Sequence, residues 1–171
     1  MKIIVFSEIE GRVEMLMKGD SAMLVNRKPF FLPDGLGDIT YQEGVVLRVS
    51  RLGKNIAPKF ADRYWDAYAV GLDMRAEQAL KEAIKDGRSW TEATSFDYST
   101  VIGEYMDKAT LNESELVIAI GEAIHRASRT MTIRQGDLIF IEKKTERKVA
   151  VRDEVIRRQR EEKEILYCKI K

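Results

Sequence analysis

The chain has 171 residues, of which 44% are apolar and 33% charged, enough for one domain with a core beneath a charged surface. Lys plus Arg number 29 and Asp plus Glu 28, so a net charge of +1 lacks the positive excess of a nucleic-acid-binding protein. The single Cys168 and single His125 exclude an internal disulfide and a Cys/His zinc site. No apolar run suits a signal peptide or a membrane span. We therefore expect a single domain over residues 1–171, in the cytoplasm, that binds neither nucleic acid nor a membrane.

The first half of the chain alternates short strands with turns. Apolar and alternating runs predict strands at Lys2–Phe6, Ala22–Val25, Pro29–Leu32 and Gly44–Leu52. Pro58 is expected to begin a helix through Ala67 that runs into a strand at Tyr68–Leu72. Asp73 would end that strand and cap a helix over about Arg75–Lys85.

The second half carries one strongly patterned helix. Trp90–Tyr105 reads as loop with a short strand, and a helix follows whose apolar residues recur every three to four positions, with Asn112 or Ser114 as its cap. A strand at Leu138–Ile141 leads into a charged tail over 142–164, and then a closing strand at 165–170. Short strands interrupted by two or three helices predict an α+β domain.

The common catalytic constellations are weakly supported. A nucleophile–histidine site would need His125, which sits on the amphipathic helix and reads as a surface or boundary residue. Cys168 reads as a small core residue. A Glu-x-Glu strand would present two carboxylates on one face for a divalent cation, but the stretch 40–45 contains a single carboxylate, Glu43.

The surroundings of Glu43 are nevertheless familiar. The sequence resembles the fumarylacetoacetate hydrolase family over most of its length, in four main stretches: Asp20–Asp34, Arg48–Ile56, Tyr64–Asp73 and Ser95–Glu104. The resemblance implies a β-rich α+β fold built around a rolled mixed sheet with two or three flanking helices, and a homodimer. It also implies Mg²⁺, Mn²⁺ or Ca²⁺ as cofactor and the cleavage or decarboxylation of 1,3-dicarbonyl and 2-oxo acids.

The implied metal ligands are mostly replaced. Family members bind the metal through a Glu-x-Glu strand and a later Asp, and an ungapped placement puts these on Gln42, Gly44 and Asp73. Only Asp73 matches, and Glu43 could serve only in a rebuilt site. The catalytic Lys of the family falls on Thr94.

Other chemical groups depart from the family as well. The Arg-Asp-x-Gln that follows the metal Asp becomes Glu77–Leu80, and the Gly-Thr-Pro turn becomes Glu142–Thr145. The His-bearing N-terminal lid is missing, and the segment between Tyr105 and Asn112 is shorter. Glu77 also has a simpler interpretation, as the partner of Lys81 in a helical i,i+4 ion pair.

Three hypotheses follow. The first is a non-catalytic homologue, a pseudoenzyme that keeps the fold and dimer and binds a small 2-oxo acid or a partner, without a metal. The second is a metal-dependent hydrolase or decarboxylase with a rebuilt Mg²⁺ or Mn²⁺ site at Asp73, Glu43 or Gln42, and Glu77. The third is a protein-interaction module using the tail from Lys143 to Lys163. As a helix cap, Asp73 should contribute roughly 0.5–2 kcal/mol, the expected loss in Asp73→Ala.

Overall fold

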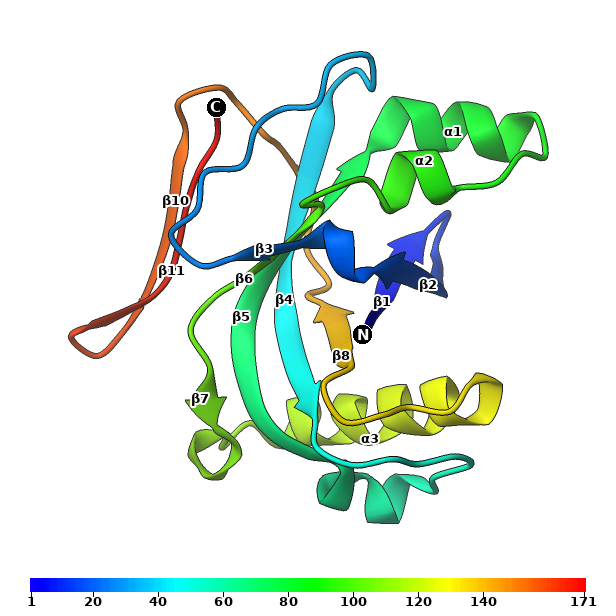
Figure 1. The fold of residues 1–171 in the computed structure, drawn as a ribbon, viewed down its shortest axis with the longest axis vertical. Coiled ribbons are helices and arrows are strands. Elements are labelled where there is room, and N and C mark those ends of the chain that lie inside the picture. The colour runs from blue at the N-terminus through cyan, green and yellow to red at the C-terminus, as the bar shows by residue number, and fades with distance from the viewer.

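A computed structural model describes residues 1–171 and shows a curved sheet with helices at its ends (Figure 1). Its two longest strands, β4 (Ile39–Val49) and β5 (Trp65–Ala76), pair antiparallel at the centre. The strand order is β2-β1-β8-β4-β5-β6-β3, with β7 beside β5 and β9 beside β4. The pairs β1–β8 and β3–β6 are parallel and the other pairs are antiparallel, so the sheet is mixed. The remaining strands are β1 (Lys2–Ile9), β2 (Arg12–Gly19), β3 (Met23–Val25), β6 (Thr100–Ile102), β7 (Met106–Asp107), β8 (Leu138–Glu142), β9 (Lys148–Val149), β10 (Val155–Arg160) and β11 (Lys163–Lys169).

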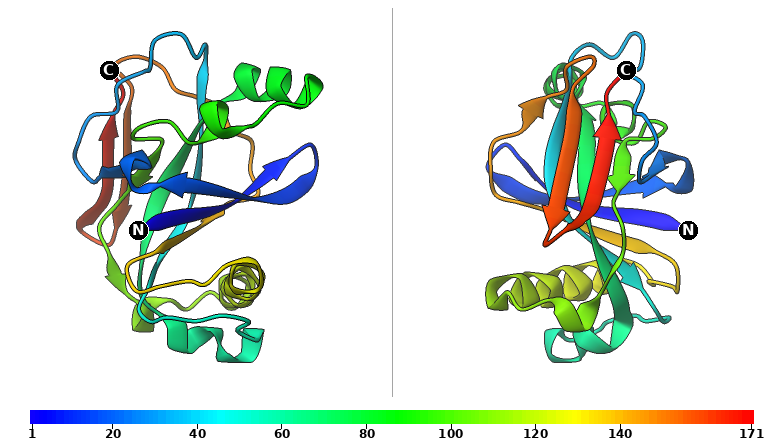
Figure 2. Two further views of the ribbon diagram at one scale, coloured as in Figure 1. Left: turned by 45° about the vertical axis from the view of Figure 1, so that its right-hand side comes forward. Right: turned by 90° about the vertical axis from the view of Figure 1, so that its left-hand side faces the viewer.

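Both faces of the sheet are buried. Along β1, Ile3 and Val5 enter one apolar core while Ile4 and Phe6 enter another, as the two-residue period of a strand requires. The long helix α3 (Ser114–Thr130) covers the second core, and the β10–β11 hairpin covers the first. Figure 2 shows that hairpin standing against the sheet.

Two shorter helices, α1 (Glu77–Lys85) and α2 (Thr91–Thr94), follow β5. Single-turn and short 3₁₀ segments lie at Asp20–Ala22, Pro58–Tyr64 and Lys108–Thr110. None of the helices has the length and apolar character needed to span a bilayer. The expected α+β class, a rolled mixed sheet with two or three flanking helices, is confirmed.

Several local predictions were wrong around β5. The segment after Pro58 is 3₁₀ and ends at Tyr64, because the strand begins at Trp65. The strand then continues through Ala76, so Asp73 lies inside it and caps no helix. The cap predicted for α3 was also wrong. The N-cap position of α3 is occupied by Glu113, and neither Asn112 nor Ser114 forms a side-chain cap there.

Candidate functional site

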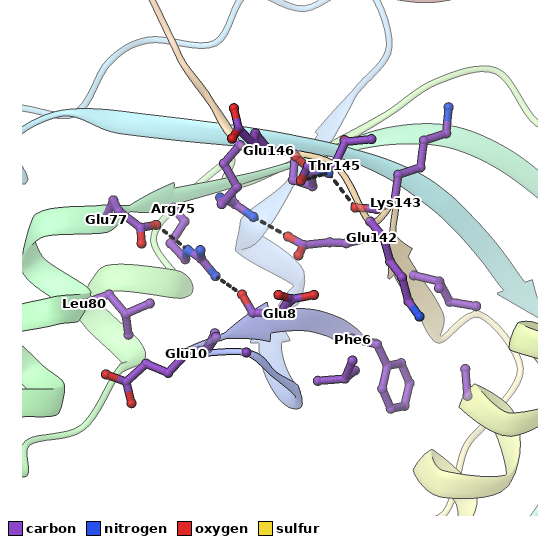
Figure 3. A pocket seen from close by; sticks show the side chains of 18 of the residues that line it. Phe6, Glu8, Glu10, Arg75, Glu77, Leu80, Glu142, Lys143, Thr145 and Glu146 are labelled. Carbon is purple, nitrogen blue, oxygen red and sulfur yellow. Dashed lines mark hydrogen bonds and ion pairs between the residues drawn. The ribbon is translucent and has the colours of Figure 1, made fainter.

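A cleft of about 1120 Å³ opens between the β1–β2 hairpin, α1, α3 and the loop that follows β8 (Figure 3). Phe6, Leu80 and Ile141 supply part of an apolar wall. The charged lining comprises as many acidic as basic side chains, namely Glu8, Glu10, Glu77, Glu122, Glu142, Glu146, Arg75, Lys81, Arg126, Lys143, Lys144 and Arg147. The formal charges of the lining therefore balance, and the sign of a ligand depends on which of these side chains are left unpaired.

The three implied ligand positions share one face of the sheet. In the β4–β5 ladder Gln42 is directly opposite Asp73, and Gly44 is opposite Gly71 two residues further along β4. Directly paired residues point to the same side, as do alternate residues of one strand. The ungapped placement thus brings Gln42, Gly44 and Asp73 together in space.

Gln42 fastens the loop after β8. Its amide nitrogen donates to the carbonyl oxygens of Lys143 and Thr145 and, over 2.7 Å, to the Thr145 hydroxyl. The side chain is 2% exposed. Gln42 therefore holds the cleft wall in place through its amide group, which a glutamate could not do because it has no donor.

Gly44 has no room for a side chain. A Cβ at this position would lie 2.3 Å from Phe140 Cε1 and 2.4 Å from the carbonyl oxygen of Ile141. These are atoms of β8, which pairs directly with β4. The second ligand position is therefore closed by packing as well as lacking a ligand.

Asp73 is already neutralised from within the protein. Its Oδ1 lies 2.7 Å from Lys18 Nζ, and both side chains are at most 1% exposed. The same ammonium donates to the Ser99 carbonyl and hydroxyl oxygens. Burial lowers the pKa of Lys18, and the Asp73 carboxylate opposes that shift. Nothing in the family resemblance pointed to Lys18.

A second cation, Arg147, joins Asp73 to Glu142. Its Nη2 donates to the Asp73 carbonyl over 2.7 Å and lies 3.4 Å from Oδ2, while its Nη1 pairs with Glu142. The Ser7 hydroxyl donates to Glu142 over 2.6 Å and accepts from Arg75 over 3.1 Å. Figure 3 shows Glu142 at the centre of the cleft.

Among the titratable groups that line the cleft, Glu142 has the pKa that departs most from its ordinary value. Burial, followed by the negative charge of Asp73, raises its pKa to about 7, against the opposing effects of Arg147 and the Ser7 hydroxyl. A carboxyl group with a raised pKa binds a proton more tightly in the folded than in the unfolded state. Its contribution to stability is therefore present at low pH and lost as the pH rises from its ordinary value through about 7.

We expect the free energy of unfolding to contain a component from Glu142 that falls by at most about 3 kcal/mol between pH 4.5 and 7.5. Urea unfolding of wild type and Glu142→Gln across this range measures it, because the difference between the two isolates Glu142 from other titrating groups such as Lys18. A wild-type-minus-variant difference that stays constant over the range would contradict the expectation.

The remaining predicted positions lie apart from Asp73. Glu43 points to the other face of β4, where it pairs with Lys143 and Arg158. Glu77 lies in the cleft wall and pairs with Arg75 over 2.8 Å, so the predicted i,i+4 partnership with Lys81 was wrong. Thr94 is buried in α2, where its hydroxyl donates to the Trp90 carbonyl over 2.9 Å.

The two residues set aside as structural behave accordingly. Cys168 is fully buried, as predicted, and burial raises the pKa of its thiol to about 11. A thiol with such a pKa stays protonated and unreactive at neutral pH. His125 Nδ1 hydrogen-bonds the Ile56 carbonyl over 2.7 Å, which fixes α3 to the segment after β4.

No family model matches the sequence, but individual proteins do. An uncharacterised protein of Pyrococcus abyssi is 26% identical over 145 residues, which are 73% of this chain and 64% of that protein. The mitochondrial oxaloacetate tautomerase of Rattus norvegicus is 23% identical over 146 residues, 74% of this chain and 66% of that enzyme. The chain thus spans about two thirds of the length of these curated relatives.

Solved structures match over nearly the whole chain. A putative fumarylacetoacetate hydrolase family protein from Yersinia pestis has a TM-score of 0.83 at 16% identity, covering 99% of this chain and 92% of that one. The resemblance to the fumarylacetoacetate hydrolase family is confirmed. Fumarylpyruvate hydrolase from Pseudomonas aeruginosa, solved with Mn²⁺ and pyruvate, has a TM-score of 0.81 at 17% identity, covering 99% of this chain and 88% of that one.

The side chains at the implied positions do not fit a divalent ion such as the Mn²⁺ in that fumarylpyruvate hydrolase structure. No group of three or more His, Cys, Asp or Glu side chains is placed to hold a metal. Gln42 is neutral and engaged, Gly44 offers no ligand, and Asp73 already faces two cations. Mg²⁺ and Mn²⁺ prefer several oxygen ligands including carboxylates, and the two carboxylates at this position, Asp73 and Glu142, are both already paired with Arg147.

Proposed function

We propose that this protein is a non-catalytic relative of the fumarylacetoacetate hydrolases that keeps their fold and uses the cleft to bind a small ligand without a metal. The observation that supports it is the state of the three implied ligand positions. One side chain is a neutral amide tied to the wall, one is absent with no space for it, and one is ion-paired. Metal-bound chemistry would require free carboxylate ligands, and the two carboxylates at this position, Asp73 and Glu142, are held in ion pairs.

A small 2-oxo acid is the proposed ligand. Lys81 and Lys144 line the cleft and have no carboxylate within ion-pairing distance, so each can bind a ligand carboxylate. Arg75 also lines the cleft. Its Nε and Nη1 donate to Glu77, Ser7 and Glu8, which leaves Nη2 to bind a ligand. The apolar wall at Phe6 and Ile141 would contact the carbon chain of the acid.

Thermal melts with oxalate, with Mn²⁺, and with both test this proposal. At one hundred times its dissociation constant a ligand stabilises by about 2.7 kcal/mol, which raises Tm by roughly 5–10 °C for a chain of this size. We expect oxalate alone to raise Tm, Mn²⁺ alone to have no effect, and the two together to match oxalate. A matched variant, Lys144→Ala with Lys81→Ala, should lose the oxalate shift while keeping the unliganded Tm.

The alternative, a metal-dependent hydrolase or decarboxylase with a rebuilt site, makes the opposite prediction. It requires acylpyruvate hydrolysis or oxaloacetate decarboxylation above the buffer rate that EDTA removes and Mn²⁺ restores. That result would overturn our proposal. The tail hypothesis is weakened because tail arginines are engaged internally, Arg158 with Glu43 and Arg160 with the Thr110 carbonyl.

We also propose that the chain forms a homodimer. Analytical ultracentrifugation at two protein concentrations tests this, and we expect twice the mass of one chain. The single domain over residues 1–171 and the cytoplasmic location stay predictions from the sequence. The oxaloacetate tautomerase of Rattus norvegicus named above is mitochondrial.

A further inference from the structure

Lys18 is an unusual residue for the interior of a protein. Its side chain projects from β2 and is fully buried, and it ranks among the largest side chains with no exposure. Lysine is almost never fully buried unless paired, because removing an ammonium from water costs several kcal/mol. Its surroundings must therefore replace the lost water with oxygen atoms.

Four oxygen atoms do so. Lys18 Nζ lies 2.7 Å from Asp73 Oδ1, 3.0 Å from the Ser99 carbonyl oxygen, 3.1 Å from the Ser99 hydroxyl and 3.4 Å from the Met74 carbonyl. These come from two segments that are distant from β2 in sequence, so the fold assembles them around the ammonium. One carboxylate with carbonyl and hydroxyl oxygens is the ligand chemistry of a hard cation.

Arg147 closes the other side of Asp73. It contacts Oδ2 at 3.4 Å and donates to the Asp73 carbonyl, while its other nitrogen pairs with Glu142 at the cleft surface. The carboxylate of Asp73 thus lies between Lys18 in the interior and Arg147 at the cleft. A fixed positive charge therefore lies on each side of this carboxylate.

We propose that the oxygen cage of Asp73, Ser99 and Met74 is a cation site that the chain fills with its own Lys18 ammonium. This inference deepens the proposed function, because it explains how Asp73 persists in a buried position without a metal. It predicts that the cage takes a primary ammonium from solution once the lysine side chain is removed.

Chemical rescue of Lys18→Ala tests the proposal. The substitution removes the atoms from Cγ to Nζ, which propylammonium replaces almost atom for atom. We expect Tm of Lys18→Ala to fall by roughly 10 °C. Propylammonium should restore at least half of that loss in a saturable way, whereas 1-propanol and tetramethylammonium should not. Wild type should show no such response.

Lys2→Ala is the matched control. Lys2 forms an ion pair with Asp137, but 22% of its side chain is exposed, so its loss leaves no sealed cage. Propylammonium should not raise Tm of Lys2→Ala. Equal effects of propylammonium and propanol on Lys18→Ala, or an unchanged Tm in that variant, would overturn the cage.

A second pair of variants covers the case in which Lys18→Ala does not fold. Lys18→Met leaves the buried Asp73 carboxylate with the more distant Arg147 as its only ion-pair partner, whereas Lys18→Met with Asp73→Asn removes both charges of the Lys18–Asp73 pair. We expect the double variant to melt higher than the single, since the penalty comes from the buried carboxylate that has lost its nearer counter-charge. A double variant no more stable than the single would contradict the proposal. Metal-dependent activity of the wild type would defeat the proposed function. If the wild type is inactive and binds no metal, but propylammonium fails to rescue Lys18→Ala, only the cage proposal is defeated.

Discussion

Asp73→Ala is expected to reduce the free energy of unfolding by about 3–5 kcal/mol, the cost of leaving one partner of a buried ion pair uncompensated. The substitution would leave the Lys18 ammonium without its ion-pair partner in a fully buried position and would remove Oδ2, one of the acceptors of Arg147. This is well above the roughly 0.5–2 kcal/mol expected for a helix cap. Urea denaturation at pH 7 measures the difference directly.

Asp66→Ala is the control for this prediction. Asp66 pairs with Arg48 over 2.8 Å, and 48% of its side chain is exposed. Exposed pairs contribute little because water and salt screen them, so the loss should stay below about 1 kcal/mol. A loss at Asp73 no larger than that at Asp66 would show that the buried pair does not hold the sheet together.

The sequence predicts those strands whose own run of apolar residues indicates that they are buried. The runs at Lys2–Phe6 and Leu138–Ile141 are apolar on both faces, and both are strands buried between two cores. The end of β5 could not be predicted in this way. Asp73 and Arg75 look like the start of a helix, and they remain in the strand because Lys18 and Ser7, far away in sequence, stabilise their charges.

The family resemblance assigned Gln42, Gly44 and Asp73 to the implied ligand positions, and the structure brings them to one face of the sheet, but the resemblance did not reveal what surrounds them. The pattern of β2 is misleading at this point, because Met17 is 58% exposed while Lys18 is buried. Apolar periodicity would turn Met17 inward and Lys18 outward. Lys18 and Arg147 have no motif around them, and Glu142 was noted only as the start of the segment that replaces the Gly-Thr-Pro turn, so only the tertiary structure brings the three to Asp73.

Gly44→Glu, the change that would return the implied carboxylate, is expected to disrupt the sheet instead of creating a metal site. Even Gly44→Ala places a Cβ 2.3 Å from Phe140 Cε1 and 2.4 Å from a backbone oxygen of β8. Overpacking of this kind costs about 1–3 kcal/mol, and more where backbone must move. The larger glutamate should therefore lower Tm more than alanine does. Gln42→Glu combined with Gly44→Glu should bind Mn²⁺ no better than wild type.

Gly19→Ala provides the matched control, because a Cβ there meets nothing within 4 Å and the glycine needs no positive φ. Its alanine variant should be as stable as wild type or more stable by about 0.4–1 kcal/mol, since alanine reduces the entropy of the unfolded chain. Thermal melts of the two alanine variants side by side separate local packing from this general effect. Equal stability would mean that β8 moves aside easily, and the double glutamate variant would then become a fair test of metal binding. A lower Tm in Gly44→Ala alone would instead identify the contact between β4 and β8 as the obstacle. That contact would then be the physical reason why Gln42→Glu with Gly44→Glu does not create a metal site.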